Sequence, residues 1–101
     1  MPILERIHAD KGELVLSDKL TFADSNDYRK KLFSLFDSKV KSIAVNLSGL
    51  SFMDSAGLGM LMVALKECQQ RGIILTLHQP RDGVKTMLNL SKSYDRFTIL
   101  D

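Results

Sequence analysis

The chain has 101 residues, of which 45% are hydrophobic and 26% are charged, as in an ordinary soluble globular protein. We therefore expect one domain over residues 1–101 with a single modest core. The formal net charge is +2 and the densest basic run is only Arg29-Lys30-Lys31, which argues against nucleic acid as a partner.

The number of cysteines and the length of the apolar runs indicate the cellular compartment. Cys68 is the only cysteine, so an intrachain disulfide and a cysteine-based zinc cluster are excluded. The first residues carry acidic side chains and no long apolar segment, and no window reaches the length that spans a bilayer. We expect a cytoplasmic protein without a membrane partner.

The first part of the chain predicts two strands and a helix. Residues 3–7 and 13–17 are short strand candidates on either side of a turn signal, Asp10-Lys11-Gly12, and together they predict a hairpin. Asp24 or Ser25 then offers an N-cap oxygen to a helix. Four side chains recur there at helical spacing: Tyr28, Leu32, Leu35 and Phe36.

A strand and a second helix follow. Residues 42–48 alternate as strand residues do, with Ile43, Val45 and Leu47 on one face, and we expect this strand to be central in a sheet. The next helix runs to about Gln70, where Gly72 is a C-terminal stop.

The last part of the chain repeats the alternation. Residues 73–78 predict a strand that Pro80 ends, and Asp82 can cap a short helix with Val84, Met87 and Leu88. Residues 97–100 form either a last short strand or a tail packed on the surface. The order β-β-α-β-α-β-α, with this final β, favours an α/β layer structure with parallel pairs in the sheet.

The stretch SFMDSAGLG (51–59) joins the central strand to the second helix. Asp54 and Ser55 are both good N-cap residues, and the sequence leaves open which of them is the cap. In either case Ser55 lies at a helix N-terminus, beyond the carboxyl end of a strand. Ligands and partners usually meet an open α/β sheet at that edge.

Two glycines in the first turns of this helix need a reason, since each costs roughly 1 kcal/mol relative to alanine. Gly57 and Gly59 either pack closely against a neighbouring segment or let another molecule approach the backbone, and one glycine can serve each purpose.

The same helix carries two stripes. The core-facing one is Leu58, Leu61, Met62, Leu65 and Cys68. The adjoining stripe is Ser55, Gly59, Met62, Val63 and Lys66. We expect Val63 to be partly exposed and the adjoining stripe to form a docking surface.

Catalysis and nucleotide binding fit Ser55 poorly. A nucleophile elbow has glycine two positions before and after the serine; Gly57 fits, but Met53 occupies the other position. The two histidines, His8 and His78, are not tied to Ser55 by the sequence. A dinucleotide fingerprint would need glycine where Met62 stands, and there is no Walker lysine.

Phosphorylation fits Ser55 better. A helix N-terminus presents free N–H groups and partial positive charge, so a phosphate of ~−1.5 to −2 charges would sit there without disrupting the helix. The neighbouring Asp54 makes the local field more negative still. A partner shaped for the neutral serine would then meet a solvated dianion, which is costly to desolvate, and would be repelled.

The segment VNLSGLSFMDSAGLGMLMVAL (45–65) resembles the signature of STAS domains, specifically the small bacterial anti-sigma factor antagonists. The resemblance implies a mixed β-sheet flanked by helices and a binding module rather than an enzyme, with no cofactor, metal or small-molecule substrate. Asp18 and Thr21 align with the glycine and aspartate of an element that many members carry, and Ala56 replaces a second serine.

This resemblance also implies a partner switch. Unphosphorylated Ser55 would let the domain sequester an anti-sigma factor, a GHKL-type serine kinase, which releases a sigma factor. The kinase would phosphorylate Ser55, and a PP2C-type phosphatase would restore binding. The expected partner-binding residues are Thr21, Asp54, Ser55, Ala56, Gly57, Gly59, Met62, Val63 and Lys66.

Three alternative functions remain open at the level of sequence. A STAS subunit of an ABC-type lipid transporter would use the same face without phosphorylation. A stressosome-like scaffold would form a very large assembly. An esterase would lose its activity in Ser55→Ala.

Overall fold

The computed structural model describes residues 3–90 and 96–101 and confirms the predicted order of elements. The strands are β1 (Ile3–His8), β2 (Lys11–Leu20), β3 (Ser42–Met53), β4 (Ile74–His78) and β5 (Thr98–Leu100). The helices are α1 (Ser25–Asp37), α2 (Ser55–Arg71) and α3 (Asp82–Leu90), and a 3₁₀ turn, η1 (Phe22–Asp24), precedes α1. Within the described ranges, no helix combines the length and the apolar character needed to cross a membrane.

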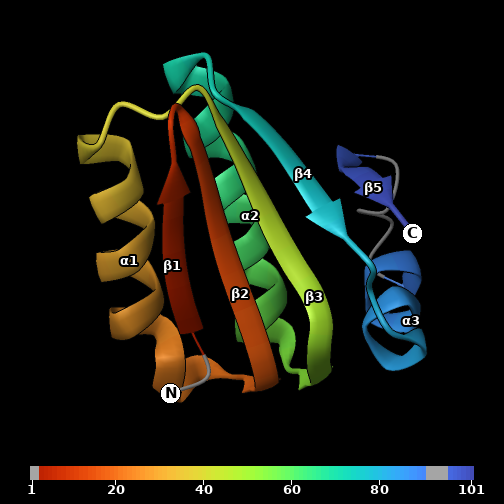
Figure 1. Cartoon of the computed structure of the whole chain (residues 1–101). Helices are drawn as coiled ribbons and strands as arrows, with labels where there is room; N and C mark the ends of the chain where they lie inside the picture. The colour runs from red at the N-terminus through yellow and green to blue at the C-terminus, as the bar shows by residue number, and fades with distance from the viewer. Residues whose placement is uncertain (1–2, 91–95) are drawn as a thin grey trace.

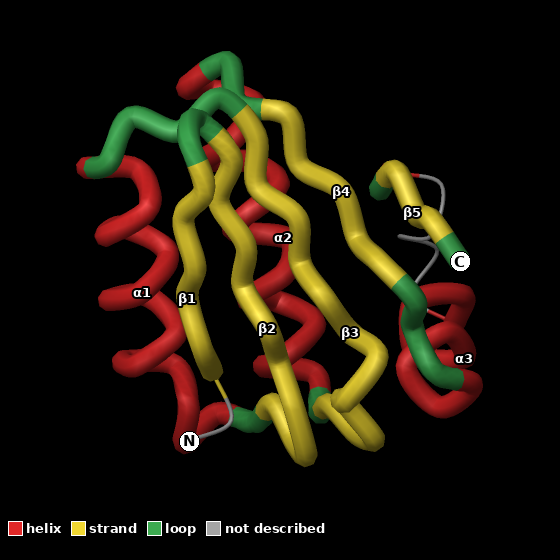
Figure 2. The backbone as a smooth tube through the Cα atoms, in the orientation of Figure 1, coloured by secondary structure: helices red, strands yellow, loops and turns green. Residues whose placement is uncertain are grey.

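The five strands form one mixed sheet in the order β1-β2-β3-β4-β5, with β3 central as expected. β1 and β2 are antiparallel, whereas β2, β3, β4 and β5 run parallel to one another. Figure 1 shows α2 behind the sheet, α1 beside β1, and α3 beyond β4 near β5. In the same orientation, the sheet face toward the viewer in Figure 2 has none of the described helices over it.

The covered face of the sheet carries the core, because alternate side chains of each strand point to the same side. The buried strand residues include Ile3, Leu14, Leu16, Ile43, Val45, Leu47, Leu75 and Leu77. α1 and α2 close this face with Leu32, Leu35, Leu61 and Cys68. Val15 and Ala44, on the opposite face, stay partly exposed.

The core-facing stripe of α2 is rotated relative to the predicted stripe. Leu61 and Cys68 are buried as expected, but Leu58, Met62 and Leu65 are only partly buried. Met60 and Ala64 are buried in addition. The phenol of Tyr28 on α1 donates to the carbonyl of Met60 at 2.9 Å and holds this side of α2 against α1.

Two strands are longer than their patterns predict. β2 extends to Leu20 and β3 to Met53, and their pairing shifts register between Val15 and Ser17 and again between Asp18 and Lys19. Such bulges insert an extra residue and change which side chains face the core. The alternation of buried and exposed residues in β3 stops at residue 48, where the predicted strand ended. The strand itself continues to Met53.

The hairpin turn lies at Ala9 and Asp10, so Lys11 and Gly12 belong to β2 rather than to the turn. Gly12 is buried because the side chain of Leu35 lies over it; a Cβ there would be 3.2 Å from Leu35 Cδ2.

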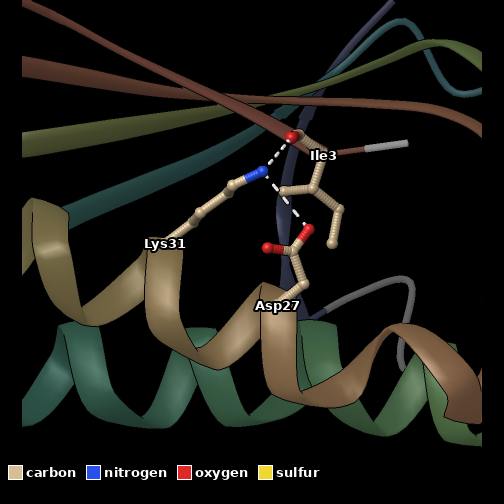
Figure 3. Close-up of polar contacts among 3 residues, drawn as sticks. All are labelled: Ile3, Asp27 and Lys31. Carbon is tan, nitrogen blue, oxygen red and sulfur yellow. Dashed lines mark hydrogen bonds and ion pairs between the residues drawn. The ribbon is translucent and has the colours of Figure 1, made fainter. Parts of the chain in front are cut away.

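Side chains at the middle and at the end of α1 fix its position. At its middle, Lys31 donates to the carbonyl of Ile3 and pairs with Asp27 at 3.2 Å (Figure 3). Near its end, the guanidinium of Arg71 on α2 lies 4.2 Å from the ring centre of Phe36, a cation–π contact. Lys31 thus ties α1 to β1, and Arg71 ties the end of α1 to the end of α2.

Lys39, just after α1, gives a test of backbone strain. Its φ is 59°, a left-handed conformation that favours glycine, whereas the φ of Ser38 is −79°. Lys39→Gly is expected to raise the free energy of unfolding by about 0.5–1 kcal/mol in urea denaturation. Ser38→Gly, on an adjacent exposed residue, should give no gain; equal effects of the two changes would contradict this account.

Candidate functional site

The N-terminus of α2 shows which residue is the cap. Asp54 is the N-cap, and its Oδ1 accepts a hydrogen bond from the backbone N–H of Gly57 at 2.8 Å. Ser55 is the first helical residue and is exposed. The serine hydroxyl is therefore not required to begin the helix.

The same carboxylate reaches a second segment. Asp54 Oδ2 accepts from the backbone N–H of Phe22 at 3.2 Å, and the N–H of Asp54 donates to the carbonyl of Leu20 at 3.2 Å. One acidic residue thus joins the start of α2 to the connection between β2 and α1.

Asp24 and Ser25 do not provide the side-chain cap of α1 that the sequence suggested. Asp24 Oδ2 accepts from the backbone N–H of Thr21 at 2.9 Å and so caps η1 instead. Ser25 Oγ donates to the carbonyl of Phe22 at 2.9 Å. Thr21, an expected contact residue, is partly buried and lies between Leu20 and Phe22, the two residues that Asp54 binds.

The two glycines of α2 have different surroundings. A Cβ on Gly57 would lie 2.4 Å from the carbonyl oxygen of Leu20 and 2.9 Å from Met53 Cβ. Gly57 is buried, so it lies beneath the expected docking surface rather than on it. A Cβ on Gly59 would have nothing within 4 Å, and Gly59 is exposed. One glycine therefore permits close packing and the other leaves an open surface.

The remaining predicted contact residues share one face of α2. Ser55, Gly59, Val63 and Lys66 are exposed, and Ala56 and Met62 are partly exposed. Val63 is 45% exposed, as its helical position predicted.

Two depressions meet at Val63. The first, which we call the α1–α2 groove, has a volume of about 490 Å³ and is lined by residues that include Phe22, Arg29, Phe33, Ala56, Gly59 and Val63. The second, which we call the α2 hollow, has a volume of about 560 Å³ and is lined by Met62, Val63, Leu65, Lys66, Gln69 and Arg96. The sequence analysis did not predict the α1 side of the groove. The one signal for it in the sequence is Phe22, an aromatic residue that belongs to no periodic pattern.

The buried reactive groups are poor candidates for chemistry. Burial raises the pKa of the Cys68 thiol to about 11 and also raises the pKa of the Tyr28 phenol. His78 Nε2 lies 2.8 Å from Thr76 Oγ1 on β4. Across residues 3–90 and 96–101, neither histidine forms a hydrogen bond with Ser55. The arrangement suits binding at an exposed hydroxyl rather than nucleophilic attack by it.

The two glycines form a matched pair for mutation. Gly57→Ala should lower the free energy of unfolding by about 2 kcal/mol or more, because the new methyl group would overlap the Leu20 carbonyl. Gly59→Ala should raise it by about 0.5–1 kcal/mol, since alanine is the better helix residue and has space. Urea denaturation of both variants measures the difference, and similar changes in the two would refute the assignment.

Asp54 gives a second test of the site. Asp54→Ala removes both hydrogen-bond acceptors and should lower the free energy of unfolding by about 1–2 kcal/mol. Asp54→Asn, which keeps one side-chain oxygen for the cap, should retain more than half of that stability. Thermal denaturation of the two variants would contradict this role if alanine and asparagine were equally tolerated.

Comparison with known proteins places these features in a family. The STAS domain family model matches residues 3–101. A candidate anti-sigma factor antagonist from Thermotoga maritima, TM1081, is 23% identical, with a TM-score of 0.88 over 98% of this chain and 86% of that one.

Two further structures share the fold. The phosphorylated form of SpoIIAA, a cell fate determinant of Bacillus, is 20% identical, with a TM-score of 0.76 over 96% of this chain and 89% of that one. A sulfate transporter family protein from Wolinella succinogenes is 16% identical, with a TM-score of 0.81 over 95% of this chain and 80% of that one. At these low identities, structural similarity supports only a shared fold. The assignment to a family rests on the family model. Matched from Ile3 to the last residue, the chain belongs to the STAS domain family.

Proposed function

We propose that this STAS domain is an anti-sigma factor antagonist whose partner binding is switched by phosphorylation of Ser55. The unphosphorylated domain sequesters an anti-sigma factor that is also a GHKL-type serine kinase, and a sigma factor is released. Phosphorylation ends the complex, and a PP2C-type phosphatase resets it. The domain itself carries out no chemistry and acts in the cytoplasm.

The single observation that supports this proposal most is the division of labour between Asp54 and Ser55. Because the Asp54 carboxylate caps α2, the exposed hydroxyl of Ser55 can be modified without removing the cap. Ser55 also lies at the positive end of the helix, where added negative charge is favourable by about 0.3–1 kcal/mol. The modified chain would thus stay folded.

The effect on a partner is large because Ser55 stands next to the α1–α2 groove. Ala56 follows it directly in the chain, and Gly59 lies one helical turn away, a rise of about 6 Å. A partner that covers the groove would therefore also cover the phosphate. Burying that charge without a paired cation costs several kcal/mol, which is enough to disrupt a moderate complex.

A transporter-associated role is the second candidate. Its support is the likeness to the sulfate transporter family protein of Wolinella succinogenes. In that role the same face would bind its partner regardless of phosphorylation. Ser55→Asp would then leave binding unchanged, which separates the two candidates.

The proposal is tested with the kinase encoded nearest to this protein's gene and ATP. We expect one phosphate on Ser55 by mass spectrometry, and none on Ser55→Ala. Ser55→Asp should weaken binding to the kinase by about tenfold or more, because it places a charge in the interface. Gln70→Glu adds a charge at the exposed far end of α2 and should leave affinity within about twofold. Modification at another residue, or full binding by Ser55→Asp, would reject the switch.

A further inference from the structure

Four acidic side chains at η1, α1 and α2, near the α1–α2 groove, make contacts within the chain. Asp54 and Asp24 accept backbone N–H groups. Asp27 pairs with Lys31 at 3.2 Å, and Glu67 pairs with Arg71 at 3.3 Å. Asp27 and Glu67 are thus paired with cations, whereas Asp54 and Asp24 keep their negative charge and hold backbone N–H groups at the starts of α2 and η1.

Three basic side chains on the same face have no ion-pair partner within the described parts of the chain. Arg29 lines the α1–α2 groove, and Lys66 and Arg96 line the α2 hollow. All three are exposed, and over residues 3–90 and 96–101 none of them takes part in an ion pair. The surface on either side of Val63 therefore presents positive charge, and its complement is acidic.

The groove between these cations is apolar and open. Phe22 is 75% exposed and Val63 is 45% exposed, although both are large apolar residues. Gly59 also lines the groove and leaves space for an atom from outside, since nothing stands within 4 Å of its missing side chain. Exposed aromatic residues beside a groove are typical anchor positions in protein interfaces.

We propose that this face binds an acidic segment of a partner protein, which inserts an apolar side chain into the α1–α2 groove and pairs its carboxylates with Arg29 and Lys66. This inference rests on the proposed function and deepens it by naming the chemistry of the partner surface. It also accounts for the sign of the switch. A phosphate on Ser55, one helical turn from Gly59 and within a Debye length of about 8 Å, would repel the same carboxylates.

A random peptide library displayed on phage tests the inference without any cognate partner. The library is selected on the wild-type protein and counter-selected on Val63→Glu, after a thermal melt has shown that the variant is folded. Gly59→Gln replaces it if Val63→Glu does not fold. We expect the enriched peptides to carry net negative charge and at least one large apolar residue. The absence of peptides that depend on these positions, or enrichment of neutral or basic ones, would overturn the inference.

The strongest peptide is then measured by fluorescence anisotropy against single variants. Arg29→Gln and Lys66→Gln should each weaken binding by about fivefold, and binding should weaken as salt is raised. Lys30→Gln removes an equally exposed charge from α1 that lines neither depression, and it should change affinity by less than about twofold. An equal loss in Lys30→Gln would mean that only diffuse charge is sensed and would also overturn the inference.

Ser55→Asp separates this inference from the proposed function. If the peptide binds the groove but Ser55→Asp binds it equally well, the phosphorylation switch fails and the acidic docking site stands. If the kinase modifies Ser55 and is released, while no acidic peptide depends on Val63, the switch stands and the acidic docking site fails.

Discussion

The carboxylate of Asp54 is the interaction on which the candidate site depends. One of its oxygens caps α2 through the N–H of Gly57, and the other holds the N–H of Phe22, which lies 32 residues earlier in the chain. The missing side chain of Gly57 lets these two segments approach, since any Cβ there would overlap the carbonyl of Leu20. One acid and one glycine thus place the exposed hydroxyl of Ser55 beside the exposed ring of Phe22 at the same end of the molecule.

The sheet makes this contact available. β2 and β3 run parallel, so both strands end at the same edge of the sheet, the carboxyl edge. The two register shifts prolong the pairing until Leu20 lies opposite Met53, directly before the two connections that Asp54 joins. The fold and the site are therefore set by one arrangement of backbone hydrogen bonds.

Local patterns predicted most of the fold and the α2 half of the site. Two of these patterns are the alternation of Ile43, Val45 and Leu47 and the helical spacing around Val63. Each involves residues close together in the chain, so it can be recognised from the sequence alone. The choice between Asp54 and Ser55 as cap was not predictable in this way, because both residue types are good N-caps; the bond from Asp54 to Phe22, 32 residues earlier, is not visible in any local pattern. The rotated stripe of α2 likewise depends on the Tyr28–Met60 contact between helices. The α1 side of the groove follows from how two helices pack, which no single segment encodes.

In the proposed switch, the same charge has opposite effects on folding and on binding. At the first residue of α2 a phosphate lies at the positive end of the helix dipole, where it stabilises by about 0.3–1 kcal/mol. In a covered interface the same dianion costs several kcal/mol to desolvate, and every 1.4 kcal/mol or so is a tenfold change in affinity. A serine deeper in α2 would lose the favourable helix term, and a serine that served as the cap would lose a hydrogen bond when modified. Placing Ser55 one residue after Asp54 avoids both costs, so binding can change by orders of magnitude while the fold stays intact.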